Sequence, residues 1–418
     1  MPGRFVVYVF VALGCGLLVR VATADITAHT DFEGASAKVL ALDPATNTIR
    51  IMPAGDPARG WPCWWSLRVD GLAKGDQLTL QVVASDALLV GPSKNRGKAL
   101  WSGWSQPVRA AVSTDGRVWR QTEPGQADGM QMNYAVVAEG GSLWLAWGPP
   151  FTPHDAGVLV ETLAKRCRGA KAIELCRSNG GRPCPALRLS SGDRPEDQRL
   201  GIWIQARQHA WESGSSWVAR GAAEWLAGDD LRAKRLRELC EITIVPIMDI
   251  DNTATGNGGK EGIPQDHNRD WTDKPHFAEV AAAQKHLRRL AEQDRLALFV
   301  DLHNPGPNDK QPFFYCCPEN TLSELGRQNQ DRFLTICRGE MSGPLELAGK
   351  PRTSGAAYDP LWKQMSKNWV AAHAPPFGVA LTLETAWNTE HSTTDGYRRL
   401  GEQLGQAMEK YVSGDVRK

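Results

Sequence analysis

Histidine and acidic residues in this sequence fall at spacings that could hold a metal ion. The stretch QARQHAWESGSSW, residues 205–217, places His209 three positions before Glu212, and a second histidine, His303, closes the apolar run LALFVDLH. Zinc favours imidazole nitrogen and carboxylate oxygen, and a catalytic zinc site uses three protein ligands with a fourth position open. We therefore expect His209, Glu212 and His303 to bind one Zn²⁺ per chain.

The His-x-x-E pair by itself is weak evidence, because a histidine with ordinary hydrogen-bond partners is the more common finding. Its position is what favours a metal site. Ligand pockets in open α/β sheets form beyond the carboxyl ends of strands. His209 follows the apolar run GIWIQA and His303 ends another apolar run, so both lie at predicted strand ends.

Two further strand ends carry residues suited to hydrolysis. Glu384 lies inside the otherwise apolar run VALTLETAW, where it could accept a proton from a metal-activated water; an ion-paired structural glutamate is the alternative. The segment DHNRDW carries Asn268 and Arg269, and an arginine can hold a carboxylate through two parallel hydrogen bonds. The alternative for Arg269 is an ordinary surface arginine.

These side chains need a scaffold of buried strands, and the second part of the chain predicts one. Continuous apolar runs alternate there with helical patterns, which is typical of a mixed, mostly parallel sheet with helices on both faces, an α/β/α arrangement. The expected strands are ALRLSS, GIWIQA, ITIVPIMD, LALFVDLH and GVALTLE, and the expected helices are 155–166, 216–227, 229–240, 275–294, 359–374 and 394–413.

The first part of the chain has a different pattern of apolar and polar residues. Period-two runs such as WSLRV and QLTLQV are separated by turn segments such as DPATN and STDG, which predicts an antiparallel β-sandwich. This pattern ends at GPPFTP, residues 148–153. Because single cores stop growing at about 250–300 residues, two domains are expected for a chain of this length. We predict a β-sandwich domain over residues 25–150 and an α/β domain over residues 151–418.

The N-terminus and the overall charge limit where the protein works and what it binds. Arg4, an apolar run over residues 5–19, and small residues before Asp25 predict a signal peptide, residues 1–24, cleaved after Ala24; an uncleaved anchor is the alternative. We expect an exported protein, periplasmic or extracellular, with no stable membrane span after cleavage. The formal net charge of +1 favours neither nucleic acid nor an anionic membrane as partner.

The cysteines are compatible with export. One of the nine, Cys15, lies in the predicted signal peptide. Cys176 and Cys184 flank the turn-like segment RSNGGRP, so a hairpin would bring them together, and we expect them to form a disulfide.

The first motif resembles that of the zinc metallocarboxypeptidases, and most closely their cytosolic-carboxypeptidase-like branch, in which it runs A-R-x-H-P-G-E-x-x-S-S-W. The stretch ARQHAWESGSSW keeps the alanine, the arginine, both ligands, the paired serines and the tryptophan. That branch also has a small β-sandwich before its catalytic domain. The resemblance implies a carboxypeptidase-like fold and peptide or protein C-termini as substrates.

Position by position, the resemblance also implies roles for individual residues. His209, Glu212 and His303 would bind zinc, and Glu384 would be the general base that later protonates the leaving amine. The terminal carboxylate of the substrate would be held by Asn268 and Arg269. Asp266 would accept a hydrogen bond from the first zinc histidine, which fixes the orientation of that imidazole.

The sequence departs from the branch at several positions. The family's H-P-G-E reads His-Ala-Trp-Glu, which places Trp211 beside the metal, and NPDG reads DIDN over residues 249–252. Relatives carry an arginine that stabilises the oxyanion in the loop before Asn-Arg, where this chain has Gly259 followed by Lys260. Lys260 could substitute for that arginine. Tyr358, in SGAAYDP, is a further candidate for lining the site, although a packed core tyrosine is the more ordinary reading.

The sequence therefore predicts an exported zinc carboxypeptidase that cleaves the last peptide bond of peptides or proteins. One alternative is a zinc amidohydrolase acting on cell-wall peptides or acyl-amino acids. Another is a weakly active or inactive protein that keeps the metal and binds peptides or glycans, with tryptophans of the first domain stacking on sugars or, more often, filling the sandwich core. Those tryptophans are Trp61, Trp64, Trp65, Trp101 and Trp104.

Overall fold

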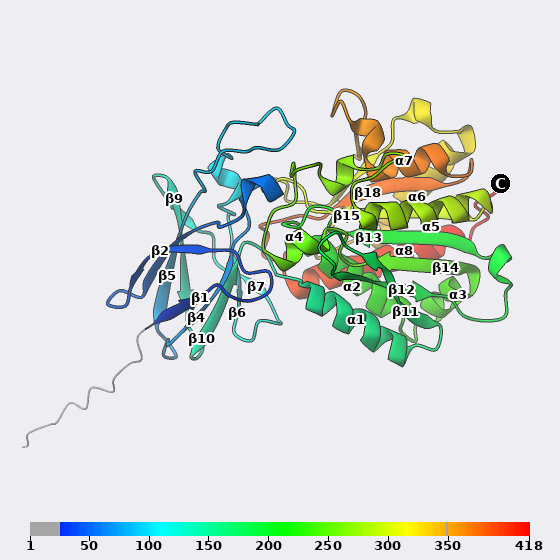
Figure 1. Cartoon of the computed structure of the whole chain (residues 1–418). Helices are drawn as coiled ribbons and strands as arrows, with labels where there is room; N and C mark the ends of the chain where they lie inside the picture. Colours follow the sequence, from blue (N-terminus) through cyan, green and yellow to red (C-terminus); the bar gives the residue numbers. More distant parts are fainter. Residues whose placement is uncertain (1–25, 348–349) are drawn as a thin grey trace, which may run out of the picture.

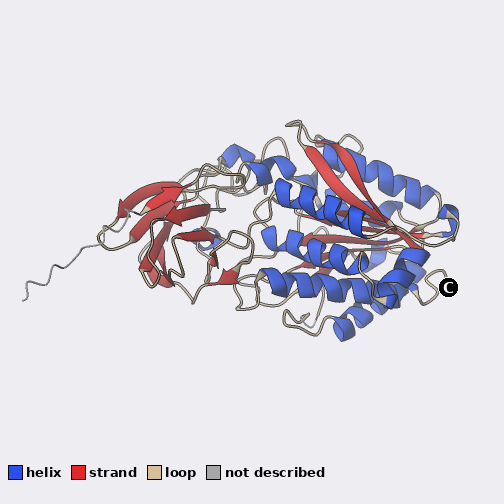
Figure 2. Cartoon of the chain, turned by 90° about the horizontal axis from the view of Figure 1, so that it is seen from below, coloured by secondary structure: helices blue, strands red, loops and turns tan. Residues whose placement is uncertain are grey.

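A computed structural model describes residues 26–347 and 350–418. The strands of the first part of the chain form one body and the α/β part forms a second body beside it (Figures 1 and 2). The predicted signal peptide, residues 1–24, lies outside the described residues. The predicted domain boundary near residue 150 falls in the connection between the last strand of the first body and the first helix of the second.

The first body consists of two five-stranded sheets. Apolar and more polar side chains alternate along its strands, so one face of each sheet is buried. In the strand Gln77–Val83, for example, Leu78, Leu80 and Val82 are fully buried between more exposed neighbours. Neighbouring strands are antiparallel except for one parallel pair, β3 with β5. The first sheet has the order β1 (Thr27–His29), β4 (Ser66–Asp70), β10 (Ser142–Ala146), β6 (Ala111–Ser113), β7 (Arg120–Gln121), and the second β2 (Lys38–Asp43), β3 (Thr48–Met52), β5 (Gln77–Val83), β9 (Gln131–Val137), β8 (Gln126–Asp128).

The second body is built on an eight-stranded mixed sheet. Its four central strands, β14, β13, β15 and β18, are mutually parallel. The antiparallel pairs are β11 with β12, β12 with β14, and β16 with β18. The prediction of a mixed, mostly parallel sheet is therefore confirmed. The strand order is β11 (Ala170–Arg177), β12 (Pro183–Leu189), β14 (Cys240–Val245), β13 (Leu200–Ala206), β15 (Leu296–His303), β18 (Val379–Glu384), β16 (Phe313–Cys316), β17 (Arg352–Thr353).

Helices cover both faces of this sheet, as predicted. One face buries Trp203 and Phe299 of the sheet against α5 (Ala278–Glu292) and α7 (Ser366–His373). The other face buries Ile202 and Val300 against a second group of helices. That group is α1 (Pro153–Arg166), α2 (Ser213–Leu226), α3 (Leu231–Leu239), α6 (Glu324–Glu340) and α8 (Thr394–Val412). A short helix, α4 (Ile250–Ala254), follows β14.

One expected helix was wrong in its extent, and one helix was not predicted. The helix expected over residues 359–374 is limited to α7, because the short 3-10 helix at Trp362–Gln364 ends at Met365, whose backbone is extended (φ −82°, ψ 143°). Helix α6 was not predicted at all. Leu325 is the one large apolar residue in its first two turns, so the apolar spacing that identifies an amphipathic helix is confined to its second half.

The described part of the chain contains eight cysteines, all of them free thiols. The expected bridge between Cys176 and Cys184 is therefore absent, although the two residues are direct partners across the β11–β12 pair. None of the described helices is both long and apolar enough to cross a membrane.

Candidate metal centre and active site

The three predicted metal ligands meet at the carboxyl ends of neighbouring parallel strands. His209 lies just beyond β13, Glu212 is the N-cap residue of α2, and His303 is the last residue of β15. Because β13 and β15 are adjacent and parallel, their carboxyl ends lie at the same edge of the sheet. This topology brings together residues that are far apart in the sequence.

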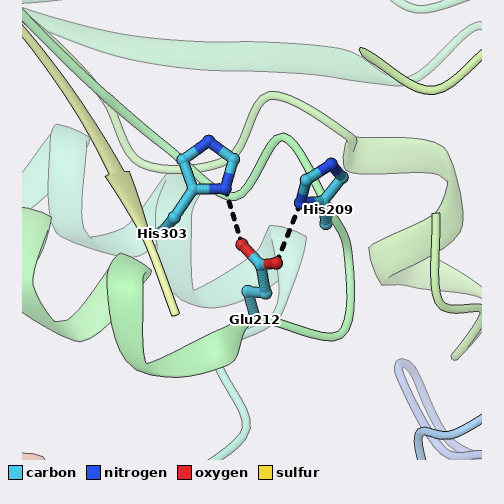
Figure 3. Close-up of side chains that lie close together, drawn as sticks. All are labelled: His209, Glu212 and His303. Carbon is cyan, nitrogen blue, oxygen red and sulfur yellow. Dashed lines mark hydrogen bonds and ion pairs between the residues drawn. The ribbon is translucent and has the colours of Figure 1, made fainter. Parts of the chain in front are cut away.

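Both histidines present the same ring nitrogen to the glutamate. Nδ1 of His209 lies 2.8 Å from Oε1 of Glu212, and Nδ1 of His303 lies 2.7 Å from Oε2 (Figure 3). One ligand atom from each residue can be chosen so that all three lie within 4.8 Å of one another. All three side chains are buried. Two imidazoles and a carboxylate that converge on one point are a zinc-type donor set.

The opposite ring nitrogens face two further acids. Nε2 of His303 lies 3.0 Å from Oδ2 of Asp301, and Nε2 of His209 lies 3.6 Å from Oδ2 of Asp266. A carboxylate behind a ligating histidine is the usual arrangement at zinc sites, since it fixes the tautomer and the ring orientation. Asp266 faces His209, but at 3.6 Å it does not make the hydrogen bond that the resemblance implies, so its role stays a prediction.

Sequence reasoning missed Asp301, although a signal was present. Asp301 precedes His303 by two positions in the strand β15, so both side chains point to the same face of the sheet. An acid inside an otherwise apolar strand needs partners, and Asp301 accepts hydrogen bonds from Gln205, Gln208 and Ser366 as well.

The charge balance of the cluster fits a bound cation. Burial opposes the ionisation of Glu212, but His209 and His303 outweigh burial and hold the pKa of Glu212 well below its ordinary range. Burial likewise opposes a charge on His303, and Asp301 and Glu212 outweigh it, which raises the pKa of His303 well above the ordinary value. Both shifts have the same cause: the buried carboxylates of Glu212 and Asp301 favour positive charge between them, and a divalent ion would supply that charge.

Glu384 stands next to the ligands as the last residue of β18. It is the direct register partner of His303 across the parallel pair β15–β18. Burial raises the pKa of Glu384 to about 7, the charge of Glu212 adds to the rise, and His303 opposes it. Its Oε2 atom has no hydrogen-bond partner among the described residues. A carboxyl group with a pKa near neutrality is suited to both taking up and returning a proton.

These residues line one cavity of about 130 Å³. It contains all the predicted site residues except Asp266, which lies behind His209. The predicted residues on its wall are His209, Glu212, Lys260, Asn268, Arg269, His303, Tyr358 and Glu384.

Arg269 enters the cavity with one anionic partner already in place. Its Nε and Nη2 atoms donate to the same oxygen of Asp359 at 3.1 and 3.0 Å, and Nη1 donates to the carbonyl of Asn268. A guanidinium has five N–H donors, so two remain for a ligand. The side-chain nitrogen of Asn268 lies 3.3 Å from Nε2 of His303.

The backbone explains why glycine occupies position 259. Gly259 has φ +78°, a conformation that favours glycine, and an added Cβ would lie 2.3 Å from a carboxylate oxygen of Asp249 and 2.8 Å from the backbone nitrogen of Ala210. An arginine therefore does not fit at this position. The next residue, Lys260, carries the cationic side chain that lines the cavity.

Trp211 and Tyr358 take different places on the cavity wall. Trp211 is almost fully buried and stacks on Trp387, with ring centroids 5.7 Å apart, so it is chiefly part of an aromatic core that reaches the cavity at one edge. Tyr358 is 51% exposed, so it is not a core tyrosine. Of the five tryptophans of the first domain singled out above, Trp61, Trp64 and Trp65 are buried and Trp101 is exposed.

A buried lysine on the cavity wall was not predicted. Lys367, at the start of α7, is 1% exposed, and its ammonium donates to the Cys316 carbonyl at 3.0 Å and to the Asn368 side chain at 2.8 Å. No acidic group forms an ion pair with it among the described residues. Burial lowers its pKa. Burying a cation without an anionic partner is costly, and this one lines the same cavity as Glu384.

Comparison with known proteins agrees with this geometry. Residues 158–306 match the family model described as zinc carboxypeptidase, and this segment holds His209, Glu212 and His303. Mouse cytosolic carboxypeptidase 3 is 30% identical over 163 residues, which is 38% of this chain and 16% of that protein. An uncharacterized protein of Zymomonas mobilis is 26% identical over 274 residues, 65% of this chain and 66% of that protein. The chain thus spans under a fifth of the length of the mouse relative.

Solved structures share the fold over both bodies. A metallo-carboxypeptidase from Burkholderia cenocepacia superposes with a TM-score of 0.76 at 21% identity, covering 93% of this chain and 99% of that chain. A metallo-carboxypeptidase from Pseudomonas aeruginosa, in complex with (2-guanidinoethylmercapto)succinic acid, gives 0.74 at 22% identity, with 93% and 99% covered. The resemblance inferred from the first motif is therefore confirmed for the fold, including the β-sandwich.

Proposed function

Because residues 158–306 match the family model described as zinc carboxypeptidase, we propose that this protein is a zinc-dependent metallocarboxypeptidase that hydrolyses the C-terminal peptide bond of peptides or proteins. The observation that carries the proposal is the position of Glu384, a carboxyl group of raised pKa, directly beside the three-ligand set in one cavity. One Zn²⁺ held by His209, Glu212 and His303 would supply Lewis acidity toward a water molecule and the scissile carbonyl.

Glu384 performs the proton transfers. As a carboxylate it takes a proton from the attacking water, and as a carboxylic acid it returns that proton to the leaving amine. The register pairing with His303 holds it beside the ligand set, so one side chain can serve both steps. Its unpartnered Oε2 atom is free to make the required contact.

Arg269 and Asn268 restrict the reaction to chain ends. The two free donors of Arg269 match the two oxygens of a terminal carboxylate, and charge-assisted bidentate pairs of this kind are strong and geometrically specific. Asp359 fixes the guanidinium plane from the other side. Because the cavity is small, the carboxylate also positions the last peptide bond over the ligand set.

Lys260 supplies positive charge on the rim of the cavity. It takes the role of the arginine that Gly259 cannot provide, facing the negative charge that develops on the carbonyl oxygen. A fixed donor at that place typically contributes about 10²–10³ in turnover.

Lys367 favours an acidic side chain on the residue that is released. It is a buried ammonium with no anionic partner among the described residues, and it lines the same cavity as Thr382 and Glu384. A carboxylate entering this part of the cavity would compensate the charge, whereas an apolar side chain would leave it buried and unpaired.

We further propose that the protein is exported. The support is the order of residues 1–24, with a basic residue, an apolar run and small residues before Asp25. N-terminal sequencing of the protein recovered from the exporting cell's periplasm or medium tests this; a start at Asp25 is expected, and an intact N-terminus in the cytoplasm contradicts it.

A comparison of substrate ends tests the activity. The zinc-loaded protein is expected to release one residue from peptides with a free C-terminus and none from the same peptides with an amidated C-terminus. Arg269→Met should abolish this difference mainly through KM. Cleavage of acyl-amino acids or cell-wall peptides in preference to plain peptides would instead favour the amidohydrolase alternative.

A further inference from the structure

The loop that carries Lys260 is bound along its length to a segment of the β-sandwich domain. Three backbone hydrogen bonds join them: Gly259 N–H donates to the carbonyl of Arg59 at 2.9 Å, Trp61 N–H to the carbonyl of Lys260 at 3.0 Å, and Ile263 N–H to the carbonyl of Ala58 at 2.8 Å. The backbone on both sides of Lys260 is therefore held by a partner from the other domain.

Close packing of glycines allows this contact. An added Cβ on Gly60 would lie 2.4 Å from the backbone nitrogen of Gly259, and one on Gly258 would lie 2.1 Å from the carbonyl oxygen of Trp61. Two backbones can approach this closely only where side chains are missing. The path of the loop therefore depends on the sandwich segment, residues 56–61.

The side chain of Trp61 contacts both residues at the tip of the loop. Its indole N–H donates to the carboxylate of Glu261 at 2.9 Å, and the ammonium of Lys260 lies 5.4 Å from the ring centroid. Trp61 is 6% exposed and packs against Trp104, which itself lines the active-site cavity. An ammonium within about 6 Å of an aromatic face is attracted to it.

Lys260 depends on this contact. It lines the cavity together with Glu384, and it forms no ion pair within the part of the chain that the structure describes. A lysine is a point charge on a flexible four-carbon stem, so it needs an external partner to stand in one place. The ring of Trp61 is that partner.

We propose that Trp61 is a positioning residue for hydrolysis: from the β-sandwich domain it holds the ammonium of Lys260 at the rim of the zinc cavity, where charge develops on the substrate carbonyl. The inference rests on the proposed function and extends it, because it makes the sandwich domain a component of the catalytic unit.

A double-mutant cycle on the full-length, zinc-loaded protein tests this. Lys260→Met is expected to lower kcat by about 10²–10³. Trp61→Leu is expected to lower kcat by about 10-fold with little change in KM, and to lower it by less than about 2-fold in the Lys260→Met background, because the two residues act as one unit. Trp61→Phe, which keeps a ring face and loses the indole N–H, should lie between Trp61→Leu and wild type.

Binding of a peptide phosphonate gives a second readout that does not depend on turnover. Its tetrahedral anion stands in for the transition state, so its inhibition constant should rise in Trp61→Leu by the same factor by which kcat falls. Zinc content should not change in either single variant. If Trp61→Leu does not fold, the same two measurements on Trp61→Phe decide the matter.

Trp64→Leu is the matched control. Trp64 is equally buried in the same domain, and its indole N–H donates to the carbonyl of Gly34 rather than to the loop. The Trp64→Leu variant should lose stability without the loss in kcat that is expected for Trp61→Leu. Equal losses for Trp61→Leu in both backgrounds, or the same kcat loss in Trp64→Leu, would overturn the inference while leaving the activity intact. Absence of hydrolysis by zinc-loaded wild type would overturn the proposed function and this inference with it.

Discussion

Glu384 and His303 are direct partners in the register of two neighbouring parallel strands, β18 and β15. Both are the last residues of their strands, so their side chains leave the same edge of the sheet. The proposed zinc ligand and the proposed proton acceptor are thereby fixed relative to each other by backbone hydrogen bonds of the sheet. The first two predictions follow from this pairing.

Replacing Glu384 by glutamine should remove turnover and leave the metal. The amide keeps the shape of the carboxylate but cannot accept the proton, and positioned acid–base groups contribute about 10²–10⁴ in rate. Steady-state kinetics and metal analysis by mass spectrometry check both halves of this expectation. Turnover close to wild type with full zinc content would show that Glu384 is not the base.

The pH profile should show an acidic limb that belongs to Glu384. Only the ionised carboxylate accepts a proton, so kcat/KM should rise as pH rises through the pKa of Glu384 and fall as pH drops below it. Burial raises that pKa to about 7 in the metal-free site. A bound cation favours the charged form, so the limb of the zinc-loaded enzyme should have its midpoint below about 7.

The control for the pH profile is the residual activity of Glu384→Gln. It should lack the acidic limb, measured with a substrate that does not titrate in the same range. A limb of unchanged midpoint in that variant would assign the titration to another group.

Asp301→Asn should weaken zinc binding by about 10–100-fold, the usual effect of losing a carboxylate that orients a ligating histidine. Competition with a chelating dye measures this directly. Asp309→Asn is the matched control, because Asp309 lines the same cavity but pairs with Arg352 and touches neither histidine. Equal zinc affinity in the two variants would contradict a role for Asp301 at the metal.

Lys367→Met should remove the preference for an acidic last residue. A hydrogen bond to a charged group contributes about 1.5–3 kcal/mol, so the ratio of kcat/KM for peptides ending in Glu over Gln should fall by about 10–100-fold. Lys363→Met, a charge change at an exposed site nearby, should leave the ratio unchanged. An unaltered ratio in Lys367→Met would place the specificity elsewhere.

Much of the site could be predicted from the sequence because several of its residues lie at the ends of apolar runs. His303 and Glu384 each end a continuous apolar run, and runs of that kind mark central parallel strands whose ends share one edge. Asp301 could have been found in the same way, from its two-residue spacing to His303 on one strand face. A local sequence pattern is sufficient to predict a site residue when the residue that it contacts lies on the same strand or on the adjacent strand.

Other features depend on contacts between segments that have no local signal. Lys367 follows a proline-containing turn, and its sequence neighbourhood predicts a solvent-exposed residue. In the structure it is the second residue of α7 and is buried. Gly259 is required because it packs against Asp249 and against Gly60 of the other domain. Cys176 and Cys184 were correctly placed opposite each other, but a register pairing does not by itself form a disulfide.

The proposed carboxypeptidase activity is best tested by mass spectrometry of a peptide incubated with the zinc-loaded protein and, in parallel, with zinc-loaded Glu384→Gln. We expect that the wild-type protein removes a single residue from the C-terminus, that it leaves the amidated form of the peptide intact, and that the variant removes nothing. Cleavage at internal bonds, equal cleavage of the amidated peptide, or no cleavage by the zinc-loaded wild type would contradict it.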